Sequence, residues 1–214
     1  MAFTRRSGFP VTGSTSGGYD SITVDPVAVG DLMIAFYFGS GFVTFSGGGV
    51  TTWNTVLQFD SADGGYMTLA IGEVTSTGSQ ALTMSTTATE YAVLNADSYS
   101  CTNTGTYFAE SSGETQSGTT TTTSVLPSLT PTLVGGLYWG YAAPNGGTNT
   151  GTVTPSGFTI EIDEDGNAII DGTSLTSGTA YAPTATQSSS PGYQCLAAIF
   201  NTLPSSSSGF FALL

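Results

Sequence analysis

Turn-forming residues recur at short intervals along the chain, which leaves room for strands but not for helices. Clusters of Gly, Ser, Thr, Asn and Pro interrupt the apolar segments about every eight to twelve residues. Between them, apolar residues alternate with polar ones or form short runs. The pattern predicts an all-β, antiparallel β-sandwich of jelly-roll-like type. Strands are expected at 21–24, 31–38, 52–59, 66–74, 80–85, 90–99, 121–126, 136–143, 158–163, 168–171, 181–187 and 193–201.

The charge composition excludes several classes of site. The chain has 2 Lys or Arg, 15 Asp or Glu and no His, for a formal net charge of −13. Without an imidazole there is no Ser-His-Asp or Cys-His catalytic site and no histidine-ligated metal. Two arginines are too few to neutralise many phosphates, so we expect neither nucleic acid nor a membrane surface as a partner.

The remaining composition is that of a folded chain without a cofactor. Hydrophobic residues make up 39 % of the 214 positions and aromatic residues 11 %, enough for a sizeable core. Apolar runs such as 32–38 are about seven residues long, far short of a membrane span. No apolar stretch follows the two arginines, so no signal peptide is expected. Cys101 and Cys195 have no metal-binding spacing and are expected to be free thiols.

The two halves of the chain are related in sequence. Residues 26–57 align with 131–162 when positions 105 apart are compared, and 91–96 align with 193–198 at a spacing of 102. We interpret this as an internal duplication that gives two pseudo-repeats, the alternative being a chance match between two β segments. The alignment places Ile34 and Trp139 at equivalent core-facing positions. Met33 and Tyr138 then face the other way, where polar replacement is tolerated unless another sheet covers them.

In each half, a proline precedes a Gly-led turn and an apolar strand (29–38), and an aromatic-led strand follows, as at Phe158. This pattern resembles the duplicated β-sandwich proteins encoded among the virion genes of tailed bacteriophages, which are minor tail, tail-fibre or head-decoration components. The resemblance covers about 21–106 (repeat 1) and 126–204 (repeat 2), with 107–125 as connector and first strand of repeat 2. The sequence departs from the pattern at Gly136, where the family has Asp, and at 51–53, where a Pro-x-Gly-Trp turn is expected.

The resemblance implies a non-catalytic structural protein without cofactors. Such a protein is assembled in the host cytoplasm, is exposed on the tail or capsid surface of the virion, and binds other virion proteins or further copies of itself. We expect residues 1–20 to be an N-terminal docking arm and 205–214 to be a Ser linker with an apolar tail. Reversing the charge of both arginines is then expected to abolish incorporation without changing the thermal midpoint. The candidate partner-binding residues are Phe3, Arg5, Arg6, Phe9, Phe210, Phe211, Leu213 and Leu214.

Acidic residues concentrate between 161 and 171, where five of the fifteen lie. Glu161, Asp163 and Asp165 are a weak calcium candidate, because clustered carboxylates supply the oxygens that calcium requires. Read as a calcium loop beginning at Glu161, however, the twelfth position is Gly172, where a bidentate Glu is needed. We therefore favour a solvated hairpin tip over a metal site.

Two other functions remain open. A host-glycan-binding adhesin or carbohydrate-binding module could use loops 42–52 and 145–152. A carboxylate glycosidase needs a pair of acids facing a cleft, and the sequence identifies no such pair. Trp53 and Trp139 align with core-facing strand positions, so we expect core aromatics rather than sugar platforms.

Overall fold

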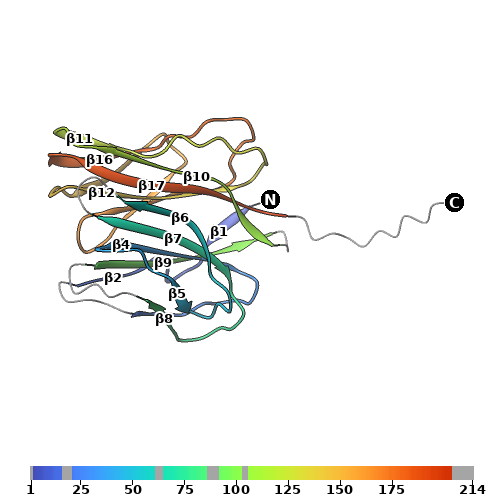
Figure 1. Cartoon of the computed structure of the whole chain (residues 1–214). Coiled ribbons are helices and arrows are strands. Elements are labelled where there is room, and N and C mark those ends of the chain that lie inside the picture. The colour runs from blue at the N-terminus through green and yellow to red at the C-terminus, as the bar shows by residue number, and fades with distance from the viewer. Residues whose placement is uncertain (1, 16–20, 61–64, 86–91, 103–105, 204–214) are drawn as a thin grey trace.

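The computed structural model describes residues 2–15, 21–60, 65–85, 92–102 and 106–203. Within these residues all the regular structure is β, and the strand pairings are antiparallel. The strands form four sheets that stack as layers: an outer and an inner sheet from the first half, then an inner and an outer sheet from the second (Figure 1). The predicted antiparallel β-sandwich is confirmed at this level.

The first half supplies one outer and one inner sheet. The first outer sheet has the order β3 (Ser21–Val24), β8 (Gln80–Met84), β5 (Phe45–Gly47). The first inner sheet has the order β1 (Phe3–Arg5), β9 (Ala92–Cys101), β4 (Leu32–Gly39), β7 (Tyr66–Glu73), β6 (Asn54–Asp60), and β2 (Val11–Thr15) also pairs with β9.

The second half supplies the other two sheets. The second inner sheet has the order β10 (Tyr107–Ser117), β17 (Tyr193–Thr202), β12 (Leu137–Pro144), β15 (Ala168–Gly172), β14 (Thr159–Ile162). The second outer sheet has the order β11 (Thr121–Val125), β16 (Thr184–Ser190), β13 (Asn149–Thr154). The strand orders of the second half match those of the first, strand for strand, when β10 is taken as the counterpart of both β1 and β2.

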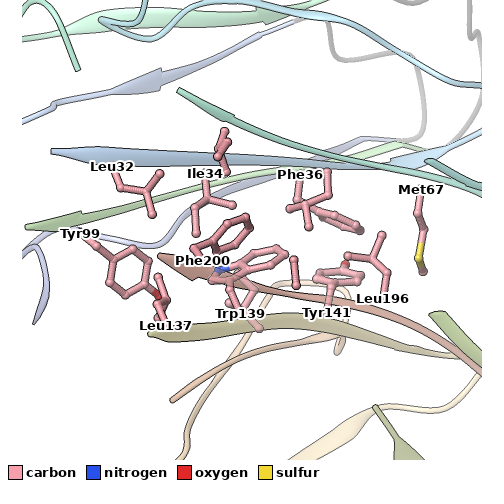
Figure 2. Close-up of a cluster of buried hydrophobic side chains, with 14 of the residues drawn as sticks. Leu32, Ile34, Phe36, Met67, Tyr99, Leu137, Trp139, Tyr141, Leu196 and Phe200 are labelled. Carbon is pink, nitrogen blue, oxygen red and sulfur yellow. The ribbon is translucent and has the colours of Figure 1, made fainter. Parts of the chain in front are cut away.

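The central core lies between the two inner sheets. Alternate side chains of β4 and β12 enter it from opposite sides, and both strands begin at the same end of the core (Figure 2). Phe36 contacts the rings of Trp139 and Tyr141 at centroid distances of 5.8 and 4.1 Å. Because burying each large apolar side chain contributes about 1.5–3 kcal/mol, this layer holds the halves together. Its members from β4 and β12 are Leu32, Ile34, Phe36, Leu137, Trp139 and Tyr141.

The other faces of the inner sheets are covered by the outer sheets. The apolar layer between the inner and outer sheets of the first half is called the first outer core, and its counterpart in the second half the second outer core. Met33 packs in the first outer core and Tyr138 in the second, and neither is exposed. Since both faces of β4 and β12 are buried, these strands are almost continuously apolar instead of alternating. From the sequence, polar replacement of Met33 and Tyr138 is expected to be tolerated unless another sheet covers them. The outer sheets are such a cover, so polar replacement at these positions is not expected to be tolerated.

The N-terminal segment is not a free arm. Its residues 3–5 and 11–15 form β1 and β2, which extend the first inner sheet by pairing with β9. Likewise 107–125 contains two strands of the second half, β10 and β11, and no separate connector. The expected docking arm at 1–20 and the expected connector ahead of the strand at 121–126 are therefore corrected: the first half begins at β1 and the second at β10. No helix in the described ranges is long and apolar enough to cross a membrane.

Candidate functional site

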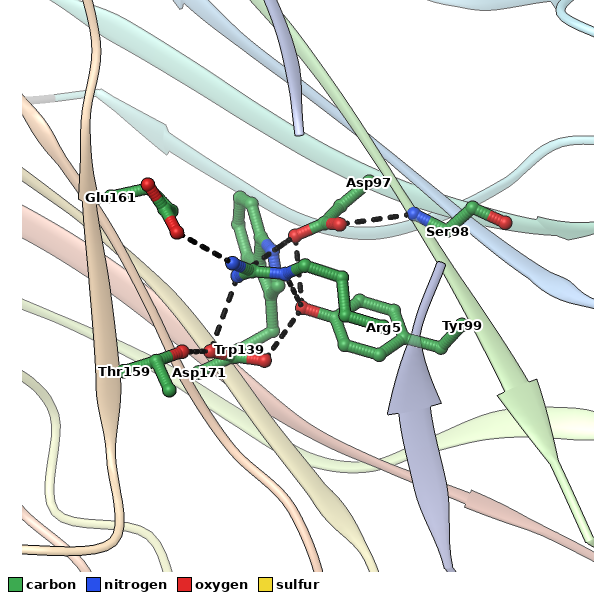
Figure 3. A network of polar contacts seen from close by, with 8 residues as sticks. All are labelled: Arg5, Asp97, Ser98, Tyr99, Trp139, Thr159, Glu161 and Asp171. Carbon is green, nitrogen blue, oxygen red and sulfur yellow. Dashed lines mark hydrogen bonds and ion pairs between the residues drawn. The ribbon is translucent and has the colours of Figure 1, made fainter. Parts of the chain in front are cut away.

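A group of polar and ionised side chains, buried except for Glu161, joins the two inner sheets (Figure 3). It consists of Arg5 from β1, Asp97 and Tyr99 from β9, and Glu161 and Asp171 from β14 and β15. We call it the inter-sheet cluster. The stacking reverses the strand order across the central core, so β1, at the edge of the first inner sheet, meets β14 and β15 of the second.

The Arg5 guanidinium lies at the centre of the inter-sheet cluster. Its Nη2 is 3.2 Å from Asp97 Oδ2 and 3.2 Å from Asp171 Oδ1, and its Nη1 is 3.7 Å from Glu161 Oε1. Its Nε donates to the Tyr99 hydroxyl at 3.2 Å. One cation therefore faces three carboxylates drawn from both halves of the chain.

The two buried carboxylates also share neutral donors. The Tyr99 hydroxyl is 2.9 Å from Asp97 Oδ2 and 3.0 Å from Asp171 Oδ2. Trp139 Nε1 donates to Asp97 Oδ2 at 3.1 Å, and Thr159 Oγ1 donates to Asp171 Oδ1. Because a phenol carries one proton, Tyr99 can donate to only one of its two acceptors at a time.

Burial governs the protonation of this cluster. Desolvation raises the pKa of Asp97 to about 6, against the opposing attraction of Arg5 and the hydrogen bond from Tyr99. Burial also raises the pKa of Asp171, again opposed by Arg5. A carboxyl that takes up a proton can donate it to the Tyr99 oxygen, which relieves the competition for the phenol proton.

The cluster is closed to a substrate. The side chains of Asp97 and Asp171 are 1 % and 6 % exposed, and they sit beside the rings of Tyr99 and Trp139 in the central core. A glycosidase also pairs a protonated acid with an ionised carboxylate, but it needs room for a sugar between them. A ligand would reach these oxygens only if the two inner sheets separated. The arrangement therefore serves as a tie between the halves.

The second arginine fixes a loop of the first half. Arg6 Nε and Nη2 donate to Asp31 Oδ2 and Oδ1, both at 2.7 Å, the two-pronged geometry that guanidinium and carboxylate prefer. The hydrogen bond that Arg6 donates to Asp31 is the main cause that raises the pKa of Arg6. This pair holds the β3–β4 loop against the chain after β1.

The predicted N-terminal binding residues are thus engaged inside the molecule. Phe3 is buried in the central core, Arg5 and Arg6 have carboxylate partners, and Phe9 packs half-buried against the first outer core. The four predicted C-terminal residues, Phe210, Phe211, Leu213 and Leu214, lie outside the described residues.

The acidic hairpin is not uniformly solvated. Asp163 is buried and accepts hydrogen bonds from the Tyr141 hydroxyl at 2.7 Å and from the Asn167 and Asp165 amides at 2.9 and 3.0 Å. Burial is also the main cause that raises its pKa. Glu161 turns instead towards Arg5. Among the described residues, no three His, Cys, Asp or Glu side chains come together as a metal site would require. The calcium candidate is therefore not assembled.

The structure contains a cavity of about 280 Å³ where the first half meets the start of β10. It lies where the chain before β6, the end of β7 and the start of β10 meet, and it reaches loop 42–52 only at its last residues. The cavity is lined by Thr51, Thr52, Asn54, Ile71, Gly72, Glu73, Thr75, Thr106 and Tyr107.

The other loop predicted for glycan binding is 145–152. In this loop, Asn149 is buried and donates to the carbonyl oxygens of Ala142 and Gly166.

Exposed apolar side chains gather at the end of the molecule where β4 and β12 begin. We call this surface the end face. Its side chains are 40 % to 65 % exposed, and they are five of the eight large apolar side chains that are exposed among the described residues. Others, such as Phe42, Val125 and Ile162, lie elsewhere. The end face comprises Val27, Val29, Leu133, Val134 and Leu203.

The chain matches no protein-family model, no curated protein and no solved structure. Its function has to be argued from its own residues.

The inter-sheet cluster was missed from the sequence, although a signal for it exists. Asp97 interrupts the apolar run of β9, and a carboxylate placed there has to be paired. The chain has only two cations, so Arg5 and Arg6 are the available partners. The pairing with Asp171 has no such signal, because it depends on how the two halves stack.

Proposed function

We propose that this chain is a non-catalytic structural component of a bacteriophage virion, exposed on the tail or capsid surface and joined to other virion subunits through its end face and the residues that follow it. The observation that carries the proposal is the end face itself. Contiguous exposed apolar surface marks an interaction site, whereas the ionised groups with shifted pKa values serve the fold. The resemblance to duplicated virion proteins supplies the setting.

The strand orders support the duplication that underlies this proposal. In both halves the inner sheet has five positions and the outer sheet three, in matching order. Gly30 and Gly135 both have positive φ, and their amides donate to Val74 and Leu175, which follow β7 and β15. The jelly-roll connectivity stays a prediction, and the pairing of β9 between β1 and β4 is compatible with it.

Mass spectrometry of purified particles tests the proposal. The chain should be present at a fixed stoichiometry in particles purified from cells that produce them, and hundreds of copies would indicate decoration whereas a few would indicate a tail tip. A chain that remains in the soluble lysate and is missing from the particles would refute the virion assignment.

A carbohydrate-binding role is the second candidate, and the cavity beside β10 favours it. Its lining offers hydroxyl, amide and carboxylate groups beside the Tyr107 ring, a combination that suits a sugar. A glycan array, run with and without calcium, tests this role. Any binding should fall in Asn54→Ala and Glu73→Gln and persist in Asn145→Ala, which lies outside the cavity lining.

A further inference from the structure

We propose that the end face is a self-association surface, on which the apolar segment 209–214 of a second copy of this chain packs. The inference rests on the proposed function, since it names the partner of the surface assigned there to joining. The segment suits an apolar surface, because its sequence is Gly-Phe-Phe-Ala-Leu-Leu and it carries no charged side chain.

Three residues at the start of β10 and just before it, Thr106, Tyr107 and Glu110, form hydrogen bonds with the segments that make up the end face. The Leu203 amide donates to the Thr106 carbonyl oxygen at 3.0 Å. The Tyr107 hydroxyl donates to the Gly30 carbonyl oxygen at 2.7 Å. Glu110 Oε1 accepts from the Leu133 amide at 3.2 Å and from the Thr132 amide. The loops before β4 and β12 and the end of β17 are therefore fastened side by side.

Both loops are held in shape before any partner arrives. In the first loop the Gly30 amide donates to the Val74 carbonyl oxygen at 2.8 Å, next to the pairing of Arg6 with Asp31. In the second, the Gly135 amide donates to the Leu175 carbonyl oxygen at 2.7 Å. A surface that is already ordered loses little conformational entropy on binding, so its apolar area contributes more fully to affinity.

Two of the acidic side chains near the end face are paired within the chain. Each copy carries a net charge of −13, which opposes association over most of the surface. At the end face, Arg6 neutralises Asp31, and the Glu110 carboxylate is turned into the loop amides and the Asn201 side chain. Two exposed carboxylates remain at this end, Asp25 in the loop before β4 and Glu73 at the end of β7 opposite Leu32, so repulsion between copies persists here and salt should screen it.

The direction of the chain favours a second copy over the chain's own surface. β17 runs towards the end face, and Leu203 lies on it. Leu203 precedes Pro204, and a residue before proline is biased to an extended conformation. The five residues 204–208 span at most about 17 Å. To cover its own end face, the segment would have to reverse within that length, whereas an unreversed path leads to a facing copy.

The arrangement is self-complementary. Two copies that face each other through this end each give a segment and receive one, which is the geometry of a two-fold dimer. The apolar surface and the apolar segment, each an aggregation liability when exposed, then cover one another.

Sedimentation velocity of the full chain over a range of concentrations tests the inference. We expect a dimer whose affinity rises with salt, because salt screens the repulsion between two acidic copies. Deleting 209–214 should give a monomer. Replacing Val29 and Val134 by Ser should weaken association by about tenfold or more, whereas Val125→Ser, an exposed valine of β11 away from the end face, should not.

Three results would overturn the inference. One is a monomer at all concentrations, and another is a dimer that survives both the deletion and the double substitution. The third is a monomer in which the deletion raises hydrogen exchange at 27–30 and 132–135, which would mean that the segment covers its own chain. A monomeric protein found in particles would refute this inference and leave the proposed function, and a dimer missing from particles would do the reverse.

Discussion

The Tyr99 hydroxyl lies 3.0 Å from Asp171 Oδ2, although these residues belong to different halves of the chain. Trp139 of the second half in turn donates to Asp97 of the first. Polar contacts across an apolar core fix how two layers are set against each other, because any slip leaves buried groups unpaired. The inter-sheet cluster therefore determines the stacking of the halves, and the surrounding apolar contacts supply most of the stability.

Stability should increase as the pH falls from about 7.5 to 5. The folded pKa of Asp97, about 6, lies above the unfolded value of 3.8, so the folded state binds the proton more tightly. The contribution of this group is complete below the unfolded pKa and is lost as the pH rises through the folded pKa. The raised pKa values of Asp171 and Asp163 act in the same direction, and the lowered pKa of Glu110 acts in the opposite one.

Thermal unfolding at several pH values measures this dependence. Asp97→Asn is the matched control, since its amide keeps one oxygen that can accept from Tyr99 and Trp139, loses the bond from the Ser98 amide, and does not titrate. The variant should show a flatter pH profile than the natural chain. An unchanged slope in Asp97→Asn would mean that other groups cause the dependence.

Arg5→Met should destabilise the fold by about 3–5 kcal/mol at pH 7, because it leaves buried carboxylates unpaired. The loss should be smaller at pH 5, where Asp97 can hold a proton. Arg6→Met should cost less, since the Arg6 side chain is twice as exposed, at 30 % against 15 %. Urea unfolding at both pH values measures these differences. The structure thus replaces the expectation that charge reversal at both arginines would leave the thermal midpoint unchanged.

The sequence predicts the strands whose apolar pattern is strong and misses those whose pattern is weak. The expected set includes β4, β7, β9, β12 and β17 of the inner sheets, and it omits β1, β2, β5, β10 and β13, of which β1, β2 and β10 also belong to the inner sheets. The omitted strands are short or rich in Ser, Thr and Gly, so they carry little alternation. Their structure depends on pairing with partners far along the chain, which a local pattern does not encode.

The mistaken N-terminal arm has the same cause. The two arginines and the apolar residues beside them predict a docking arm, but Phe3 pairs with Cys101 and is buried. The location of Asp171 could not be foreseen either, since its contact with Arg5 requires β1 and β15 to meet across the central core. Local pattern predicted the antiparallel strands, whereas the order of the layers and the inter-sheet cluster depend on how the two halves stack.

Truncation of the central and outer cores should cost comparable amounts. Ile34→Ala and Trp139→Ala should each destabilise by about 2–5 kcal/mol. Met33→Ala should fall at the lower end of the same range, because the first outer sheet covers it completely. Val29→Ala, on the exposed end face, is the control and should change the unfolding free energy by less than about 0.5 kcal/mol. A tolerated Met33→Ser would contradict the four-layer structure.

The two cysteines should react at very different rates. Both are free thiols, Cys101 half-buried and Cys195 fully buried, and desolvation raises the pKa of Cys195 far above its usual range. Because the thiolate is the reactive form, a disulfide reagent should label Cys101 first in the folded protein. Unfolding in denaturant without reductant should release two thiols. Zero thiols would show that the pair is bridged.

Gly136 should resist the aspartate that occupies the corresponding position of the first half. Asp31 fits there because Arg6 meets it with two hydrogen bonds of 2.7 Å. A Cβ on Gly136 would lie 3.0 Å from Asn201 Nδ2 and 3.2 Å from the Phe200 carbonyl oxygen. The carbonyl belongs to β17 and cannot yield easily, and Asn201 is held by its bond to Glu110.

Gly136→Ala should therefore destabilise by about 1–3 kcal/mol. Gly136→Asp should cost more, because it adds a carboxylate close to the Glu110 side chain, with no arginine to pair with it. Gly118→Ala is the control, since a Cβ at Gly118 meets nothing within 4 Å. Urea unfolding of the three variants decides the outcome. If Gly136→Asp were as stable as the natural chain, the contacts with Asn201 and Phe200 would not be what excludes a side chain at position 136. The presence of Gly here, where the first half has Asp31, would then need another cause.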